Sequence, residues 1–434
     1  MLEKNNKRLI NAWASFDWSN SVYNLIITNA IFPIYFLSTT KYAFCSENVQ
    51  FFGLTIGNSV IYSYAISFAY LVIVFLAPVL SGIADFSGRK KRFMQFFTYL
   101  GSLSCIGLYF FTGENVEYGI ACSVLACIGF AGSLVFYNAF LPEVATEDKM
   151  DKVSARGFAM GYIGSVILLI INLLIYKKFE WFGLETAGAA TRFGFILVGV
   201  WWMGFAQIAF YFLKDRATGK AISFDILGKG FEELKKVFQV VRKKTVMLRF
   251  LSSFFLYSMG VQTVMLLAPL FGEKEVGMST DEMIYVVLIL QIVAIIGAYI
   301  FALISKFRGN GFAIGTTLII WVFICITGYF LKEKVSFFGL AGMLGFVMGG
   351  VQSMSRSTWS KLIPEGTKDT ASFFSFYDVT EKLAIVIGTF TYGFIDQITG
   401  SMRNSMVFMS LFFIGGFVIL QFAKLKKNLN PAKA

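Results

Sequence analysis

Long apolar runs recur along this 434-residue chain, and they limit its fold more than any other feature. A helix of about 20 mostly apolar residues crosses the hydrocarbon core of a bilayer. Lipid-exposed segments must satisfy their backbone polar groups internally, so such runs predict helices. There are twelve of them, at residues 11–38, 57–83, 93–113, 118–141, 156–177, 191–213, 247–271, 282–304, 311–331, 335–361, 371–397 and 403–423.

Composition excludes the soluble and disordered classes of protein. Hydrophobic residues make up 56% of the chain and charged residues 15%, whereas a soluble domain carries about 25% charged residues. We therefore expect an all-α membrane protein that crosses the bilayer twelve times. The first run is too polar for the apolar core of a signal peptide and lacks a cleavage site, so we expect it to be retained.

The cysteine and histidine content argues against metal sites and cofactors. The chain has five scattered cysteines without a C-x-x-C pair, and it has no histidine. Nothing resembles a phosphate loop or a nucleophile–base pair, so neither a cofactor nor enzymatic catalysis is predicted. Because histidine is absent, a proton carried near neutral pH would have to bind a carboxylate with a perturbed pKa.

The distribution of lysine and arginine predicts the orientation. The segments on the amino-terminal side of the membrane hold 29 of the 38 Lys and Arg residues, the opposite loops hold 8, and Lys382 lies within a run. Basic residues concentrate on the cytoplasmic side, so both termini are predicted to be cytoplasmic. The net charge of +12 thus reflects topology and does not indicate nucleic-acid binding. Short loops and termini favour a bacterial inner membrane, with a vacuolar membrane as the alternative.

A basic segment divides the twelve runs into two sets of six. The predicted divisions are an N-terminal half at 1–213, a linker at 214–246 and a C-terminal half at 247–434. Pro-Glu pairs follow the fourth and tenth runs in the same register, as expected of two pseudo-symmetric halves. The linker sequence "GFEELKKVFQVVRKK" predicts an amphipathic helix on the inner leaflet. Its apolar face would consist of Phe231, Leu234, Val237, Phe238 and Val241.

A charged loop follows the second run. Residues 81–93 read "SGIADFSGRKKRF" and resemble the loop signature of the major facilitator superfamily, G-x-L-A-D-R-x-G-R-K/R. The matching positions are Asp85, Gly88, Arg89 and Lys90, with Ser81 in place of the first glycine. An acid beside a tight glycine turn and a basic cluster suits a latch between the two halves. The alternative is a plain basic anchor for the membrane surface.

Several further segments resemble one family of that superfamily. They are "WASFDWSNSVYN", "YNAFLPEVA", "GFAMGYIGS", "GGVQSMSRSTWSKLIPEG" and "SFFSFYDVTEK". Their order and spacing resemble the autophagy-associated vacuolar amino-acid effluxers and their bacterial permease relatives, over residues 11–420. The resemblance implies the major facilitator fold, alternating access, amino acids as cargo and export as the direction. It also implies that helices 1, 4, 7 and 10 line the cavity.

Two departures qualify these resemblances. In the seventh run, Met259-Gly260 stands where the family has Asp-Gly, so a coupling carboxylate is missing there. In the fifth run, "GFAMGYIGS" lacks the proline and the last glycine of the drug/proton antiporter pattern G-x-x-x-G-P-x-G-G. The second departure disfavours drug efflux, and close helix packing explains the remaining glycines.

Charged residues within the runs are costly, and each is a candidate for function. Asp378 and Lys382 lie four residues apart in the eleventh run and are predicted to form a structural ion pair. Glu381, with Tyr377 one turn before it, is a candidate for coupling or substrate binding through contact with Arg356. The alternative for Glu381 is polarity that only packs helices together.

The first run carries a polar stripe at helical spacing. Lipid would leave these groups unsatisfied, so they must face a cavity or form a buried seam between helices. The stripe consists of Trp13, Asp17, Asn20 or Ser21, Asn24 and Thr28. The fourth, seventh and tenth runs would add Asn138, Gln262 and Gln352.

Arg356 and Trp359 share a face with Gln352 in the tenth run. A guanidinium beside an aromatic ring suits a substrate carboxylate. The alternative is that Arg356 extends to the phosphates of the inner leaflet.

Together these features predict a monomeric secondary transporter for small polar or zwitterionic solutes, with amino acids favoured. Its partners would be a small-molecule substrate, the lipid bilayer and, as candidate coupling ions, protons. The second hypothesis is a proton-coupled exporter of amphipathic drugs or lipids.

Overall fold

The computed structural model describes residues 3–215 and 226–425. Within these ranges the α-helices are α1 Lys7–Val22, α2 Phe32–Phe44, α3 Asn58–Ser87, α4 Lys90–Gly107, α5 Val116–Ala139, α6 Leu141–Val144, α7 Glu147–Lys177, α8 Ala187–Phe212, α9 Ile226–Lys243, α10 Thr245–Val276, α11 Thr280–Arg308, α12 Asn310–Phe330, α13 Lys334–Leu362, α14 Thr370–Thr399 and α15 Met402–Ala423. A π-helix, Tyr23–Ala30, joins α1 to α2, and 3-10 turns occur at Leu108–Phe110 and Phe179–Phe182. Strands β1 Asn48–Phe51 and β2 Leu54–Gly57 pair as an antiparallel hairpin.

The predicted class of membrane helices is confirmed. Among the described residues, ten helices are long and apolar enough to cross a bilayer, and the bent pair formed by α1 and α2 makes eleven. The remaining predicted run falls on α14, which has 30 residues but carries Asp378, Glu381 and Lys382 near its middle. These charges lower its hydropathy, so the count of twelve stays a prediction.

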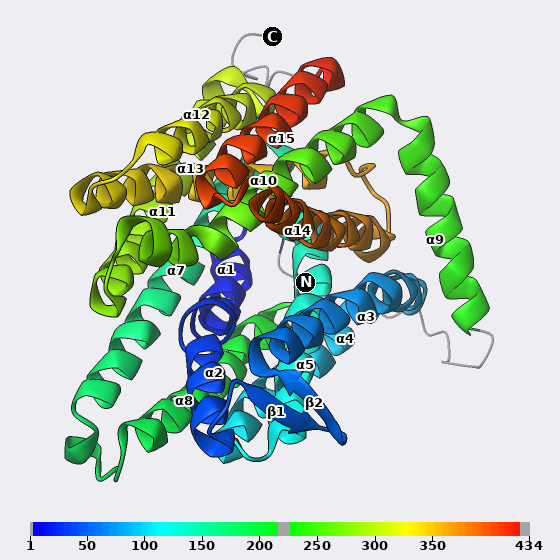
Figure 1. Ribbon diagram of the computed structural model, residues 1–434. Helices are drawn as coiled ribbons and strands as arrows, with labels where there is room; N and C mark the ends of the chain where they lie inside the picture. Colours follow the sequence, from blue (N-terminus) through cyan, green and yellow to red (C-terminus); the bar gives the residue numbers. More distant parts are fainter. Residues whose placement is uncertain (1–2, 216–225, 426–434) are drawn as a thin grey trace.

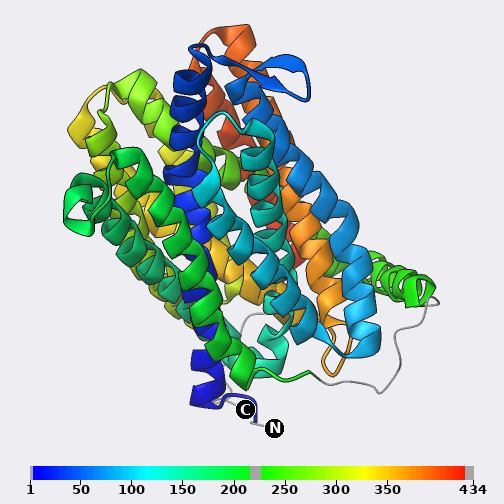
Figure 2. The same cartoon turned by 90° about the horizontal axis from the view of Figure 1, so that it is seen from below.

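The helices run side by side as one bundle (Figures 1 and 2). Figure 2 shows the β1–β2 hairpin at one end of the bundle and both chain termini at the other. We call these the hairpin end and the termini end. For residues 1–213 and 247–434 we keep the names N-terminal half and C-terminal half from the predicted division.

The first predicted run is broken rather than straight. α1 begins after Asn6, whose side chain accepts hydrogen bonds from two backbone N–H groups of the first turn. The chain then widens into the π-helix and bends by 42° before α2. Pro33 lies in the first turn of α2, where its missing N–H breaks no helical hydrogen bond. The proline therefore restarts the helix beyond the bend.

The β1–β2 hairpin was not predicted, because its segment lies in the loop between the first two apolar runs. Its turn places Phe52 and Gly53 at φ 47° and 80°. Two successive positive φ angles are typical of the tight turns that join antiparallel strands. The alternation of Val49 and Phe51 before the turn, and of Leu54 and Ile56 after it, was the available signal.

The linker helix lies against the bundle. α9 packs on α3, α10 and α14 (Figure 1), toward the termini end of the bundle (Figure 2). Val237 and Val241 are buried, and Phe238 contacts the ring of Phe376 on α14. Part of the predicted apolar face therefore packs against the helix bundle, whereas the sequence had predicted that this face lies on the inner leaflet. Residues 216–225 of the predicted linker, and the side chain of Phe231, lie outside the described residues.

Glycines allow α11 and α13 to pack backbone against backbone. A Cβ atom at Gly349 would collide with the carbonyl oxygen of Ala294, and one at Gly297 would collide with that of Phe346. Membrane helices associate through such small residues because lipid supplies no hydrophobic drive for helix pairing. The close approach positions α13, which carries several cavity residues.

We expect Gly349→Ala to destabilise the protein by about 1–3 kcal/mol, the usual cost of overpacking. Thermal unfolding in detergent would measure the loss. The matched control is Gly339→Ala on the same helix, where an added Cβ meets no atom within 4 Å. Equal melting temperatures for the two variants would contradict the close-packing interpretation.

Candidate functional site

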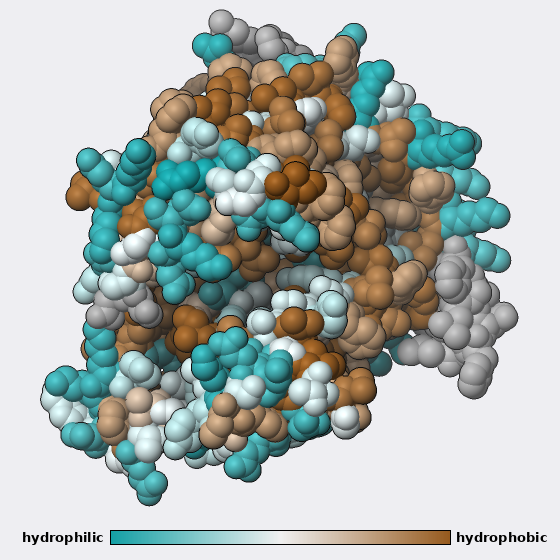
Figure 3. Space-filling model, in the orientation of Figure 1, coloured by the Kyte–Doolittle hydropathy of each residue, from teal (hydrophilic) through white to brown (hydrophobic). Residues whose placement is uncertain are grey.

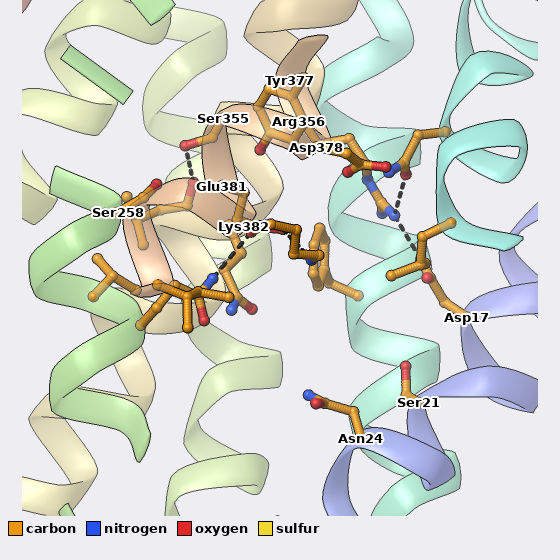
Figure 4. Close-up of a pocket in the computed structure, with 18 of the residues that line it drawn as sticks. Asp17, Ser21, Asn24, Ser258, Ser355, Arg356, Tyr377, Asp378, Glu381 and Lys382 are labelled. Atoms are coloured by element: carbon orange, nitrogen blue, oxygen red, sulfur yellow. Dashed lines mark hydrogen bonds and ion pairs between the residues drawn. The ribbon is translucent and has the colours of Figure 1, made fainter. Parts of the chain in front are cut away.

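A cavity of about 180 Å³ lies between the two halves in the middle of the bundle. Its walls come from α1, the π-helix, α3, α5 and α7 on one side and from α10, α11, α13 and α14 on the other. Figure 4 shows polar and charged side chains from both sides pointing into it. Ten predicted substrate or coupling residues line it: Asp17, Asn20, Ser21, Asn24, Asn138, Gln262, Gln352, Arg356, Tyr377 and Glu381.

Trp359 does not line the cavity, although the sequence grouped it with Arg356. Its ring is fully buried, and its Nε1 donates to the backbone oxygen of Phe373 at 3.0 Å. The ring stacks on Phe250 and Tyr377. Trp359 therefore packs α13 against α10 and α14, and a direct contact with substrate is not supported.

The polar stripe of α1 reaches the cavity only along part of its predicted length. Asp17, Asn20, Ser21 and Asn24 line the cavity, whereas Thr28 does not. Thr28 lies within the π-helix, whose wider i→i+5 turns shift side chains off a face drawn at α-helical spacing. The stripe therefore continues into the first turn of the π-helix, at Asn24, and leaves the cavity before Thr28.

An ion pair between the halves lies in the wall of the cavity. Arg356 Nη1 on α13 donates to Asp17 Oδ2 on α1 at 3.0 Å, and both side chains are almost fully buried. Arg356 Nε and Nη2 donate to Ser154 Oγ and the Ser154 backbone oxygen at 3.0 and 2.9 Å, and Nη1 also reaches Asn138 Oδ1 at 3.4 Å. The Tyr137 hydroxyl donates to the same Asp17 oxygen at 2.8 Å. This arrangement pairs the two charges and adds hydrogen bonds to each, as a buried ion pair requires.

The position of Arg356 corrects two expectations. Its predicted contact with Glu381 is not made, because the guanidinium pairs with Asp17 instead. It also does not extend to lipid phosphates, since only 2% of its surface is exposed. Aromatic rings of Trp13, Tyr137 and Phe158 surround it, the last with its centroid 4.1 Å away. This enclosure suits a weakly hydrated guanidinium.

A second charged group lies on α14, facing the cavity (Figure 4). Lys382 Nζ pairs with Glu381 Oε2 at 3.0 Å, and Gln262 Nε2 donates to Glu381 Oε1 at 3.0 Å. The predicted ion pair between Asp378 and Lys382 is therefore wrong, because Lys382 pairs with Glu381. Lys382 bonds to its chain neighbour, and one oxygen of Asp378 is buried without a hydrogen-bond partner among the described residues.

Sequence reasoning missed part of the lining. Tyr162 on α7 donates to Gln352 Oε1 on α13 at 2.8 Å, which adds a contact between the halves. Ser355, which was also missed, shares a hydrogen bond of 2.7 Å with the Tyr257 hydroxyl. Gln291 Oε1 and Asn20 Nδ2 are buried without partners among the described residues. Gln291 lies in a strongly apolar run, and its isolated amide was the signal that could have found it.

The charged loop joins the two halves at the termini end. Asp85, at the end of α3, accepts from the backbone N–H groups of Ala371 and Ser372 at 3.1 and 2.7 Å. These N–H groups belong to the first turn of α14, where the helix dipole favours an anion. Lys90 donates to Thr370 Oγ1 at 2.6 Å and pairs with Glu143. Gly88 adopts φ 67° at the end of α3, which turns the chain toward Arg89 and α4.

A second cluster at the termini end was not predicted. Asp151 of α7 accepts from Ser305 Oγ at 2.7 Å and from Asn310 Nδ2 at 2.8 Å. Lys361 Nζ pairs with it at 2.6 Å. In the sequence, Asp151 belongs to the charged stretch "EDKMDK", which looks like an ordinary solvated helix start. Only the packing of α7 against α11 and α13 shows that this acid is buried.

The cavity is closed toward the termini end. Among the described residues, hydrogen bonds between the halves involve the cavity wall, Ser154 beside it, the Asp85 loop or the Asp151 cluster. Figure 3 looks onto the hairpin end and shows this face hollowed over the middle of the bundle. The geometry is therefore that of a pocket between two halves that opens toward the hairpin end.

Known proteins share this architecture. A model of the family described as "Vacuole effluxer Atg22 like" matches residues 5–433. The chain belongs to the Atg22-like family. It is 29% identical to the uncharacterized MFS-type transporter YxiO of Bacillus subtilis, over 95% of this chain and 94% of that one. It is 25% identical to Autophagy-related protein 22 of Saccharomyces cerevisiae, over 86% and 79% of the two chains.

Solved structures show the same fold. The fucose transporter FucP in its outward conformation superimposes with a TM-score of 0.67 at 15% identity, covering 95% of this chain and 98% of that one. The human organic anion transporter MFSD10 superimposes with a TM-score of 0.70 at 14% identity, covering 96% of this chain and 100% of that one. The predicted major facilitator fold is thus confirmed. This Atg22-like protein is a multi-pass membrane transporter, and not an enzyme.

Breaking the ion pair of this Atg22-like protein should cost stability. Asp17→Asn leaves the Arg356 charge buried without its partner, and a loss of about 3–5 kcal/mol is expected. Thermal unfolding in detergent would measure the loss. The double variant Asp17→Asn with Arg356→Gln removes both charges and should recover much of the stability. A double variant that melts lower by the sum of the two single losses would contradict the pairing.

Proposed function

We propose that this chain is a secondary active transporter that exports amino acids, or similarly small zwitterionic solutes, by alternating access. The observation that supports this proposal most strongly is a central cavity lined by charges of both signs. Glu381 and Asp378 offer carboxylates to an ammonium group, and Lys382 offers a cation to a carboxylate. Asn20 and Gln291 add a donor and an acceptor that have no partner among the described residues.

The size of the cavity favours small solutes. Its volume of about 180 Å³ lies below the range of about 300–1,000 Å³ usual for drug-sized ligands. The apolar part of an amphipathic ligand would also face the buried ion pairs of the cavity, and it could not form hydrogen bonds with them. Export of amphipathic drugs or lipids is therefore the weaker hypothesis. The effluxer description of the family supports export as the direction.

Arg356 takes a different role in this proposal from the one that the sequence suggested. Its donors are occupied by Asp17 and Ser154 in this conformation, so a substrate carboxylate would have to displace an ion pair. We assign Arg356 and Asp17 to holding the halves together beside the cavity. Substrate contacts are assigned to the α14 charges and to the amides of Asn20, Gln262 and Gln291.

In an alternating-access cycle, the contacts at the termini end would keep that end of the cavity closed. In the proposed orientation, both termini and the basic loops face the cytoplasm, so the cavity opens to the outside. Opening inward would break the bonds of Asp85 to α14 and those of Asp151 to α11–α13. The Asp85 loop and the Asp151 cluster would then act as two latches of the outward-open state.

Transport by the purified protein tests the proposed substrate class. Proteoliposomes should accumulate labelled amino acids from a mixture above the level of empty liposomes, and a pH gradient should change the rate. Glu381→Gln should reduce the flux, since it removes a charge from the cavity wall. Glu365→Gln, in an exposed loop at the termini end, is the matched control and should leave it unchanged. Flux of amphipathic dyes without any amino-acid flux would contradict the proposal.

The Asp151 latch predicts a shift of conformation. Spin labels at the exposed positions Lys149 and Lys306 report the separation of the halves at the termini end. They would be placed in a background with the exposed Cys45 replaced by serine. Asp151→Ala removes an acceptor shared by three groups, so pulsed electron resonance should detect a larger fraction of long distances. Asp148→Asn is the control, because Asp148 bonds to Thr146 of its own half. An unchanged distance distribution in Asp151→Ala would argue against the latch.

A further inference from the structure

The charges that line the cavity do not balance. Among the described residues, three carboxylates (Asp17, Asp378 and Glu381) and two cations (Arg356 and Lys382) line it. With all five ionised, the cavity would hold one net negative charge in a poorly solvated site. An uncompensated buried charge is expensive and is usually neutralised by a change of protonation. One of the three carboxylates is therefore expected to hold a proton.

Hydrogen bonding distinguishes the three carboxylates. Asp17 accepts from Arg356 and from the hydroxyl of Tyr137. Glu381 accepts from Lys382 and Gln262, one on each oxygen. Asp378 is only 2% exposed, and its Oδ2 has no hydrogen-bond partner among the described residues. A carboxylate whose oxygen is buried without a donor is the one that gains most from a proton.

The surroundings of Asp378 offer it no cation of its own. Lys382, one turn further along α14, is the nearest cation to act on it and is bonded to Glu381. Arg356 of α13 is bonded to Asp17. The other titratable groups around this part of α14 are neutral near pH 7 because phenols and thiols titrate well above it. They are Tyr377 on α14, Tyr70 on α3, Cys127 on α5 and Tyr257 on α10.

We propose that Asp378 is the proton-carrying residue of this transporter, and that the ammonium group of a substrate displaces the proton. In the outward-open state Asp378 takes a proton from the water of the cavity. When a substrate binds from the inner side, the carboxyl O–H gives its proton to water and the carboxylate pairs with the ammonium group. One proton then enters for each substrate that leaves, which couples export to the proton gradient. This mechanism rests on the proposed function.

Infrared titration of the reconstituted protein tests the proton site without any substrate. The C=O stretch of buried protonated carboxyl groups should be present at low pH, disappear as the pH rises, and be diminished in Asp378→Asn. Glu381→Gln is the matched control on the same helix. It should keep the band but move its loss to lower pH, because Lys382 is then free to stabilise the Asp378 carboxylate. A band of undiminished size in Asp378→Asn would overturn the proposal.

A second variant tests the same assignment if Asp378→Asn fails to fold or to insert into the membrane. Lys382→Gln removes the nearby cation, so the loss of the band should move to higher pH. An unchanged midpoint would overturn the assignment to Asp378.

Transport separates failure of this proposal from failure of the proposed function. Asp378→Asn should lose acceleration by a pH gradient, and exchange of substrate without a gradient should also fall, because the same carboxylate pairs with the ammonium group. Retained acceleration would overturn the role of Asp378. If the wild-type protein moves no amino acid, the proposed function fails, and the infrared titration still decides whether Asp378 binds the proton.

Discussion

The buried ion pair between Arg356 and Asp17 is the interaction on which this structure depends most. Each charge comes from a different half, and neither could remain ionised in this environment without the other. The pair fixes how α13 meets α1, and Gly157 leaves the space that it occupies, because a Cβ there would collide with the Asp17 carboxylate. The cavity forms beside this contact, so the pair joins the halves at the place where a transporter must separate them.

Polar contacts between the halves lie on both sides of this pair along the bundle. Tyr162 and Gln352 link the halves on the hairpin side of the pair, and toward the termini end lie the Asp151 cluster and the bond of Asp85 to the start of α14. Such contacts hold only while their geometry is good, since each donor and acceptor can exchange its partner for water. Polar contacts of this kind suit a joint that must open and close, whereas the Gly349 contact between α11 and α13 lies within one half.

The sequence was informative about the candidate site wherever lipid imposes a penalty. Asp17, Asn20, Gln262 and Glu381 could be identified because a polar group in an apolar run needs an aqueous or protein environment. The same argument could not assign partners. Lys382 is one turn from Asp378 and next to Glu381, and only the packing of α14 against α10 and α3 decides that Glu381 receives it. Asp151 escaped notice because its charged neighbours made its position look solvated.

By itself, the sequence determined the class of the protein, the run of membrane helices, the family and most of the polar residues of the cavity. These follow from the cost of burying polar groups in lipid, which acts on each segment separately. The tertiary structure alone decided the partner of each charge, the break between α1 and α2 that takes Thr28 off the stripe, and the end at which the cavity closes. These features depend on distances between segments far apart in the chain, and the pattern of one helix does not contain them.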